Sequence, residues 1–232
     1  MSFSRPNPPW EDLERQLRQE FEFKIEPRFD GLIEFSAVLE EAYNDRISQV
    51  HYAIKNAESK YDVRASDQIV EHESWSAVQF HEHQIVPQRI GIIFTAYSFT
   101  EIAVQDLCDR AKNLFSLEKS IRELRGNGLR RCRNYLSEYA TIESTSLNER
   151  FDQVLRLGVL RNVLTHCGLL LPDGHKDQEK LREWADEESA PFSIENGGEL
   201  NLKPAIGNQF VESGKALILE THLALTETLR TY

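Results

Sequence analysis

The chain has 232 residues, of which 40% are hydrophobic and 28% are charged, and its formal net charge at pH 7 is −11. This length is enough for a single domain with a buried core, and the composition excludes an intrinsically disordered chain. The negative charge argues against a protein that coats nucleic acid over its whole surface, because phosphate binding requires local positive potential.

The N-terminal segments predict helices. Residues 1–9 contain three prolines and are expected to form a mobile tail. A charged helix over residues 10–23 is expected to end at Pro27. Apolar residues recur every three or four positions over residues 29–61, which predicts a long amphipathic helix. Residues 63–86 are less regular and predict only a short helix.

Several absences narrow the class of protein. The start of the chain lacks the basic-then-apolar pattern of a secretory leader, and its longest apolar run is too short to span a membrane. Three cysteines have neither paired nor metal-ligand spacing, and no Gly-rich phosphate loop is present. We therefore expect a cytoplasmic protein without a membrane segment, a metal or a cofactor.

The middle of the chain predicts a buried helix. Pro87 is expected to open it, and residues 89–115 are apolar on nearly all sides over most of their length, as in the central helix of a bundle. Glu101 is conspicuous there. Its carboxylate either faces solvent or is partly buried, in which case a basic group must compensate it. The glycines of residues 126–128 predict a turn.

Charge is unevenly distributed along the chain. Residues 110–133 hold eight basic and two acidic side chains, whereas residues 173–199 hold nine acidic and three basic ones. The ordinary interpretation is a set of solvated helix faces and loops. The alternative is a basic surface for a polyanion, with Arg125, Arg130 and Arg131 as candidates for guiding RNA and the acidic loop as a cover over the site.

The last third predicts a helix, a hairpin and a closing helix. Ser146 and Glu149 form a capping box that starts a helix, and Gly168 is expected to end it. Two short alternating segments around three turn residues predict a small β-hairpin near residues 191–203. A leucine-rich helix over residues 211–229 closes the chain. We therefore predict one domain over residues 1–232, a mainly α helical bundle with a small hairpin insertion.

The helix that ends at Gly168 has two faces. At 100° per residue its leucines and valines form a core face, and a stripe about 140° wide carries the polar residues. The stripe consists of Gly158, Arg161, Asn162, Thr165 and His166. A glycine within it lets a partner helix or a substrate approach the backbone closely.

The residue types on this stripe suit cleavage of an RNA phosphodiester without a metal. Arginine offers a planar fork of donors for phosphate, and histidine donates and accepts protons near neutral pH. Asn162 is expected to orient both groups. Arg161 and His166 lie at opposite edges of the stripe, so one copy would hold a phosphate loosely. Two copies that face each other would place both pairs around one cleft, which favours a homodimer.

The pattern Arg161-Asn162-x-x-x-His166 resembles the R-x-x-x-x-H signature of the HEPN superfamily. The similarity extends over residues 90–229: the earlier apolar helix with Glu101 matches a HEPN core helix that carries an acidic residue, and the hairpin and closing helix match the RNase-type families. His166 is followed by Cys167-Gly168, which differs from the x-Tyr of the toxin branch paired with nucleotidyltransferase antitoxins.

The resemblance implies a metal-independent endoribonuclease that works as a dimer, with RNA as substrate. It also implies a place in toxin–antitoxin, abortive-infection or antiphage systems, with an antitoxin or defence protein as partner. In this interpretation His166 is the general acid and base, Arg161 stabilises the phosphate, Asn162 orients them, and Glu101 and Thr165 support them. The alternatives are a non-catalytic HEPN-like module that binds a protein or nucleotide, and an unrelated helical interaction protein.

Overall fold

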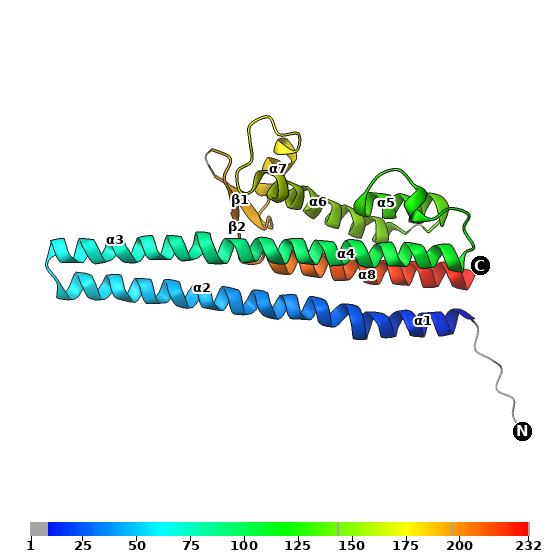
Figure 1. The fold of residues 1–232 in the computed structure, drawn as a ribbon, viewed down its shortest axis with the longest axis horizontal. Helices are drawn as coiled ribbons and strands as arrows, with labels where there is room; N and C mark the ends of the chain where they lie inside the picture. The colour runs from blue at the N-terminus through cyan, green and yellow to red at the C-terminus, as the bar shows by residue number, and fades with distance from the viewer. Residues whose placement is uncertain (1–8, 143, 196, 232) are drawn as a thin grey trace, which may run out of the picture.

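Two long helical segments run antiparallel along the whole molecule (Figure 1). The computed structural model describes residues 9–142, 144–195 and 197–231. The first segment joins α1 (Pro9–Glu20), a π-helical turn (Phe21–Ile25) and α2 (Glu26–Lys60); the second joins α3 (Val63–Phe80), a π-helical turn (His81–Ile85) and α4 (Val86–Leu114). The tip of the α2–α3 hairpin extends beyond the other elements. The long helix expected over residues 29–61 is confirmed, and most of the tail expected at residues 1–9 lies outside the described residues.

Each long segment contains a proline that does not end it. Pro27 and Pro87 each lie two residues after a π-helical turn. A proline inside an α-helix lacks an N–H and clashes with the carbonyl four residues earlier, and a π-turn widens the helix at that point. The predictions that Pro27 ends a helix and that residues 63–86 hold only a short one are therefore wrong, because the π-turns accommodate both prolines.

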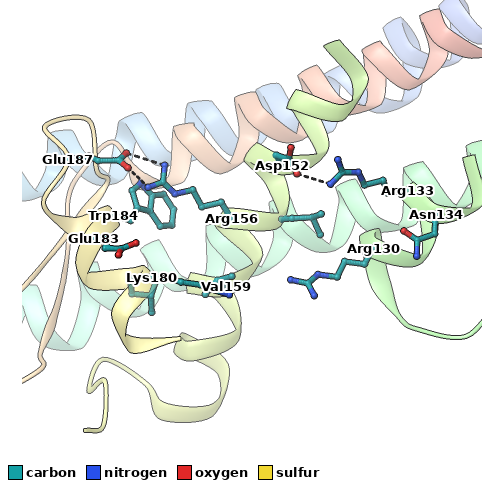
Figure 2. A pocket seen from close by; sticks show the side chains of 12 residues that line it. Arg130, Arg133, Asn134, Asp152, Arg156, Val159, Lys180, Glu183, Trp184 and Glu187 are labelled. Carbon is teal, nitrogen blue, oxygen red and sulfur yellow. Dashed lines mark hydrogen bonds and ion pairs between the residues drawn. The ribbon is translucent and has the colours of Figure 1, made fainter. Parts of the chain in front are cut away.

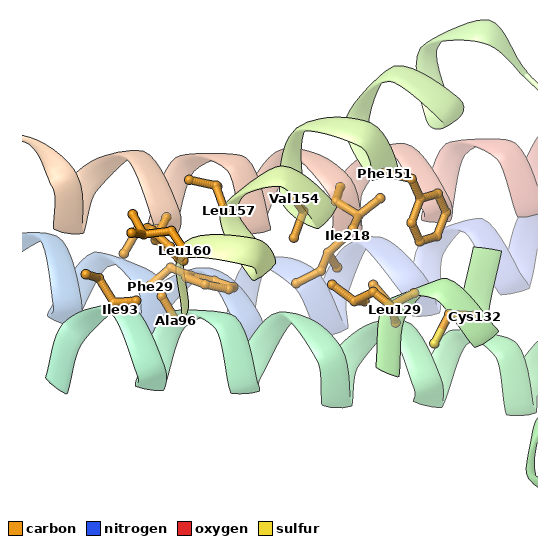
Figure 3. Close-up of a cluster of buried hydrophobic side chains, with 14 of the residues drawn as sticks. Phe29, Ile93, Ala96, Leu129, Cys132, Phe151, Val154, Leu157, Leu160 and Ile218 are labelled. Carbon is orange, nitrogen blue, oxygen red and sulfur yellow. The ribbon is translucent and has the colours of Figure 1, made fainter. Parts of the chain in front are cut away.

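The core lies between the long segments, α6 (Thr145–Cys167) and α8 (Ile206–Thr231). Figure 3 shows Val154, Leu157 and Leu160 of α6 directed toward α4 and α8, where they meet Ile93 and Ile218. All five side chains are at most 3% exposed. Full burial of such a side chain contributes about 1.5–3 kcal/mol to folding, so this face fixes the rotation of α6 about its own axis.

The smaller elements are the 3-10 turn Ile121–Glu123, α5 (Gly128–Asn134), the π-helical turn Tyr135–Tyr139, α7 (Gln178–Ala185), β1 (Phe192–Ile194) and β2 (Leu200–Leu202). The strands pair antiparallel with Phe192 opposite Leu202, and Trp184 packs edge-on against Phe192. The predicted hairpin, the turn before α5 and the mainly α architecture are confirmed; the HEPN type stays a prediction.

A buried arginine on α4 connects this helix to α2 and to strand β2. Arg89 on α4 is 3% exposed, and its Nε and Nη2 donate to the carboxylate of Glu40 on α2 at 2.7 and 2.5 Å. Its Nη1 donates to the backbone carbonyl of Leu202 on β2 at 2.8 Å, and its guanidinium lies over the ring of Tyr43. Every nitrogen of this guanidinium therefore has a partner, which is what a buried charge requires.

None of the described helices is long and apolar enough to cross a membrane.

Candidate active site

Helix α6 carries the polar stripe. Ser144 is its N-cap, and the Ser144 hydroxyl accepts a hydrogen bond from the Leu147 amide at 3.0 Å. The capping box predicted at Ser146 and Glu149 is therefore wrong, because the helix has its N-cap two residues earlier, at Ser144; the Ser146 hydroxyl instead donates to Glu220 on α8. The predicted end is confirmed, because Gly168 is the C-cap with a φ of 64°, a left-handed conformation that glycine adopts easily.

Arg161 lies half-buried over two aromatic rings of α4. Its guanidinium carbon is 5.6 Å from the ring centroid of Phe94 and 5.7 Å from that of Tyr97. Its Nη1 donates to the side-chain oxygen of Asn162 at 3.1 Å. Its Nε is buried without a hydrogen-bond partner, and no carboxylate pairs with it among the described residues. The rings hold this guanidinium in place while much of its donor capacity stays unused.

Gly158 makes room for Tyr97. A Cβ atom at Gly158 would lie 2.5 Å from the Tyr97 hydroxyl oxygen and 3.0 Å from the ring carbon that bears it. The close approach that we expected at this glycine is therefore made by a neighbouring helix, α4, through the side chain of Tyr97. Tyr97 could not be predicted from the sequence, because nothing in an apolar helix marks which aromatic side chain faces the stripe.

The Tyr97 hydroxyl, which lines the space beside Gly158, donates no hydrogen bond to another described residue. Burial raises the pKa of Tyr97 to about 12, and the neighbouring Glu101 carboxylate adds to the rise, whereas Arg161 and Arg130 oppose it. The phenol therefore keeps its proton, and its ability to donate, throughout the neutral range.

These groups line a cleft of about 680 Å³ on the outer side of α6. Its polar lining comes from four parts of the chain: Tyr97 and Glu101 on α4; Asn127 and Arg130 at α5; Arg161 and Asn162 on α6; Lys176, Asp177 and Lys180 before and in α7. Four of these side chains are cations and two, Glu101 and Asp177, are carboxylates. The two asparagines and the phenol add uncharged donors. The cleft is thus a polar recess suited to a phosphate.

Glu101 lies in this cleft, half-buried. Its Oε1 accepts a hydrogen bond from Gln105 at 3.1 Å, and its carboxylate lies beside Gly128, whose φ is 58°. Of the two positions considered for the Glu101 carboxylate, partly buried and solvent-facing, the partly buried one agrees better with the structure. No ion pair to Glu101 occurs in the described residues; Arg161 and Arg130 line the same cleft.

His166 does not join Arg161. It is exposed near the end of α6 and is not part of the cleft lining. Thr165 is also exposed, and its hydroxyl donates to the Arg161 backbone carbonyl at 2.8 Å. The Asn162 side chain accepts a hydrogen bond from Arg161, and none joins it to His166 among the described residues. The expectation that it orients both groups is therefore met for the arginine and not for the histidine. One chain therefore brings together Arg161, Asn162 and Glu101, and leaves His166 outside.

The three arginines proposed to guide RNA have different positions. Arg130 is exposed and lines the cleft, whereas Arg125 is exposed and lies outside its lining. Arg131 is half-buried with a buried Nε that has no hydrogen-bond partner. Only Arg130 therefore has the position that the sequence interpretation assigned to all three.

The acidic segment does not simply cover the cleft. Part of it is α7, whose Leu181 and Trp184 are buried in the core. Lys176 and Lys180, two of the three basic residues in this segment, line the cleft. The segment therefore presents positive charge to the cleft. We missed both lysines because the net charge of residues 173–199 hides which side chains face α6.

Within the described residues no group of three or more His, Cys, Asp or Glu side chains is placed to hold a metal ion. No protein-family model, curated protein or solved structure matches this chain.

Proposed function

We propose that the protein is a metal-independent endoribonuclease of the HEPN type, and that the cleft at Arg161 is its phosphate site. The observation that carries the proposal is Arg161 itself: a guanidinium held on two rings, with a buried Nε and no carboxylate partner among the described residues. An unpaired buried donor costs about 1–3 kcal/mol, so this arrangement is expected where a ligand supplies the missing anion.

The proposed reaction needs only protein side chains. The 2′-hydroxyl of the RNA attacks the adjacent phosphorus, and a His166 imidazole accepts its proton. A bond forms between the 2′-oxygen and phosphorus, the bond from phosphorus to the 5′-oxygen breaks, and a protonated His166 donates a proton to the leaving oxygen. Arg161 and the Tyr97 hydroxyl stabilise the negative charge on the phosphate oxygens. The products are a 2′,3′-cyclic phosphate and a 5′-hydroxyl.

Because His166 is exposed and lies away from the Arg161 cleft of its own chain, the proposed enzyme requires a second copy of the chain. His166 lies outside the cleft that Arg161 lines, so a histidine must reach that cleft from elsewhere. A two-fold homodimer supplies it, because each motif then faces its counterpart. The role in a toxin–antitoxin or antiphage system, with an antitoxin or defence protein as partner, rests on the family resemblance alone.

Purified protein incubated with RNA in EDTA tests the nuclease. We expect cleavage that survives chelation, leaves cyclic phosphate ends, and disappears in both Arg161→Ala and His166→Ala. Equal background cleavage in all three proteins would reject it. The same position of His166 favours one alternative, a non-catalytic module that binds a protein or nucleotide partner through the Arg161 cleft. Nucleotide binding that needs Arg161, without cleavage of RNA, would support that alternative.

A further inference from the structure

A second hollow continues the Arg161 cleft along α6. It has a volume of about 540 Å³ and lies between α5, α6 and α7 (Figure 2). The two hollows share four lining residues, Arg130, Leu155, Val159 and Lys180. They therefore form one groove with the phosphate site at its inner end.

The shared residues form a floor and two walls. Leu155 and Val159 are four residues apart on α6, so they lie on one side of the helix, and both are half-buried. Arg130 extends from α5 toward this floor, and Lys180 lies on α7 at its other side. Both cations are exposed, and neither forms an ion pair with a described residue. The middle of the groove thus combines an apolar floor with free positive charge on either side.

The outer end of the groove is neutralised. Arg133 donates to Asp152 at 2.7 Å, and Arg156 pairs with Glu187 while its guanidinium lies 4.6 Å from the ring centroid of Trp184. Figure 2 shows both pairs, and Glu183 adds a further carboxylate there. Among the described residues that line the groove, the cations without an ion pair are Arg130, Arg161, Lys176 and Lys180.

We propose that this groove binds single-stranded RNA, an inference that rests on the proposed function of the Arg161 cleft. The strand crosses α6 with its bases or sugars on Leu155 and Val159 and its phosphates at Arg130 and Lys180. Single strands expose base faces that pack on such a floor, whereas an A-form duplex keeps its bases stacked inside. The floor therefore selects the single strand, and Arg130 and Lys180 select the polyanion.

Fluorescence anisotropy with a labelled 2′-O-methyl RNA tests the groove, because this probe lacks the attacking hydroxyl and separates binding from cleavage. Arg130→Ala and Lys180→Ala are each expected to weaken binding about fivefold and to reduce the slope of log K against log salt by about 0.7, the value for one phosphate contact on a single strand. Arg182→Ala is the matched control, because Arg182 is exposed on α7 but lines neither hollow.

The outcomes separate the groove from the nuclease. Equal losses in all three variants, or a duplex of the same sequence that binds as tightly as the single strand, would overturn the groove. If the protein cleaves RNA through Arg161 while Arg130→Ala and Lys180→Ala bind normally, the groove is wrong and the nuclease stands. If both variants lose binding and no cleavage occurs with unmodified RNA, the groove stands and the nuclease is wrong.

Discussion

Arg89 and Arg161 are both stacked on tyrosine rings, yet their donors are used differently. Arg89 donates from all three guanidinium nitrogens, to Glu40 and to the Leu202 carbonyl. Among the described residues Arg161 donates only to Asn162, and its buried Nε has no partner there. A structural arginine is saturated by the fold, whereas one that the fold holds in place and leaves unsaturated has capacity for a ligand.

Removal of Arg89 should have the largest effect on stability. Arg89→Met leaves Glu40, whose side chain is 17% exposed, without its cation. Loss of one partner of a buried pair costs about 3–5 kcal/mol of unfolding free energy. Urea denaturation measures this loss, and the double variant with Glu40→Gln should recover part of it. If Arg89→Met lowered the unfolding free energy by less than about 1 kcal/mol, Arg89 would not be the arginine that stabilises the fold.

Removal of Arg161 should affect activity instead. Arg161→Gln is expected to lower metal-independent RNA cleavage about 10²–10³-fold, as for other donors that stabilise a transition state. Its unfolding free energy should change by less than about 1 kcal/mol, because no ion pair is lost. If Arg161→Gln lost as much unfolding free energy as Arg89→Met and cleaved RNA at an unchanged rate, Arg161 would have a structural role and not a functional one.

His222 tests whether every unpaired buried group is a functional site. It is 6% exposed on α8, its Nε2 has no hydrogen-bond partner among the described residues, and Arg110 and Glu20 are its charged neighbours. Burial lowers its pKa to about 4, and Arg110 adds to the fall. The unfolded chain, with a histidine pKa near 6.5, therefore binds the proton more readily than the folded one.

The stability that neutral His222 contributes is fully present above pH 6.5 and is lost as the pH falls toward 4. The loss is about 3 kcal/mol, from 1.36 kcal/mol for each unit of pKa difference. Denaturation of the protein and of His222→Leu at pH 7 and pH 4.5 measures most of this loss, and the variant should lose less on acidification. Parallel losses would remove His222 as the cause.

The smallest effect is expected from the Tyr97 hydroxyl. Tyr97→Phe keeps the ring beneath Arg161 and removes a donor that has no partner in the described protein. Cleavage should fall about tenfold, since a hydrogen bond to a charged group contributes about 1.5 kcal/mol, and stability should not change. Gly158→Ala, whose Cβ would meet the hydroxyl, should lower cleavage in the same direction. Unchanged cleavage in Tyr97→Phe would remove the phenol from the site.

The helices could be predicted from the sequence where hydrophobic periodicity and helix-end signals agree. Only some residues of the site could be predicted. Helix α6 with its polar stripe and its end at Gly168 follows from the wheel, because local spacing decides which residues share a face. Pro27 misled the prediction because a π-turn is a backbone adjustment without a clear sequence signal. Tyr97 and Lys180 were missed because they reach Arg161 only through the packing of α4 and α7 on α6.

In the proposed enzyme, the Arg161 cleft of one chain is completed by His166 of a second chain. Co-expression of Arg161→Ala and His166→Ala chains with different tags, followed by purification on both tags, yields only mixed assemblies. These should regain cleavage in EDTA that neither variant shows alone, because one intact Arg161 then meets one intact His166. A mixed assembly that forms and stays inactive, or a protein that cleaves RNA as a monomer, would contradict the claim.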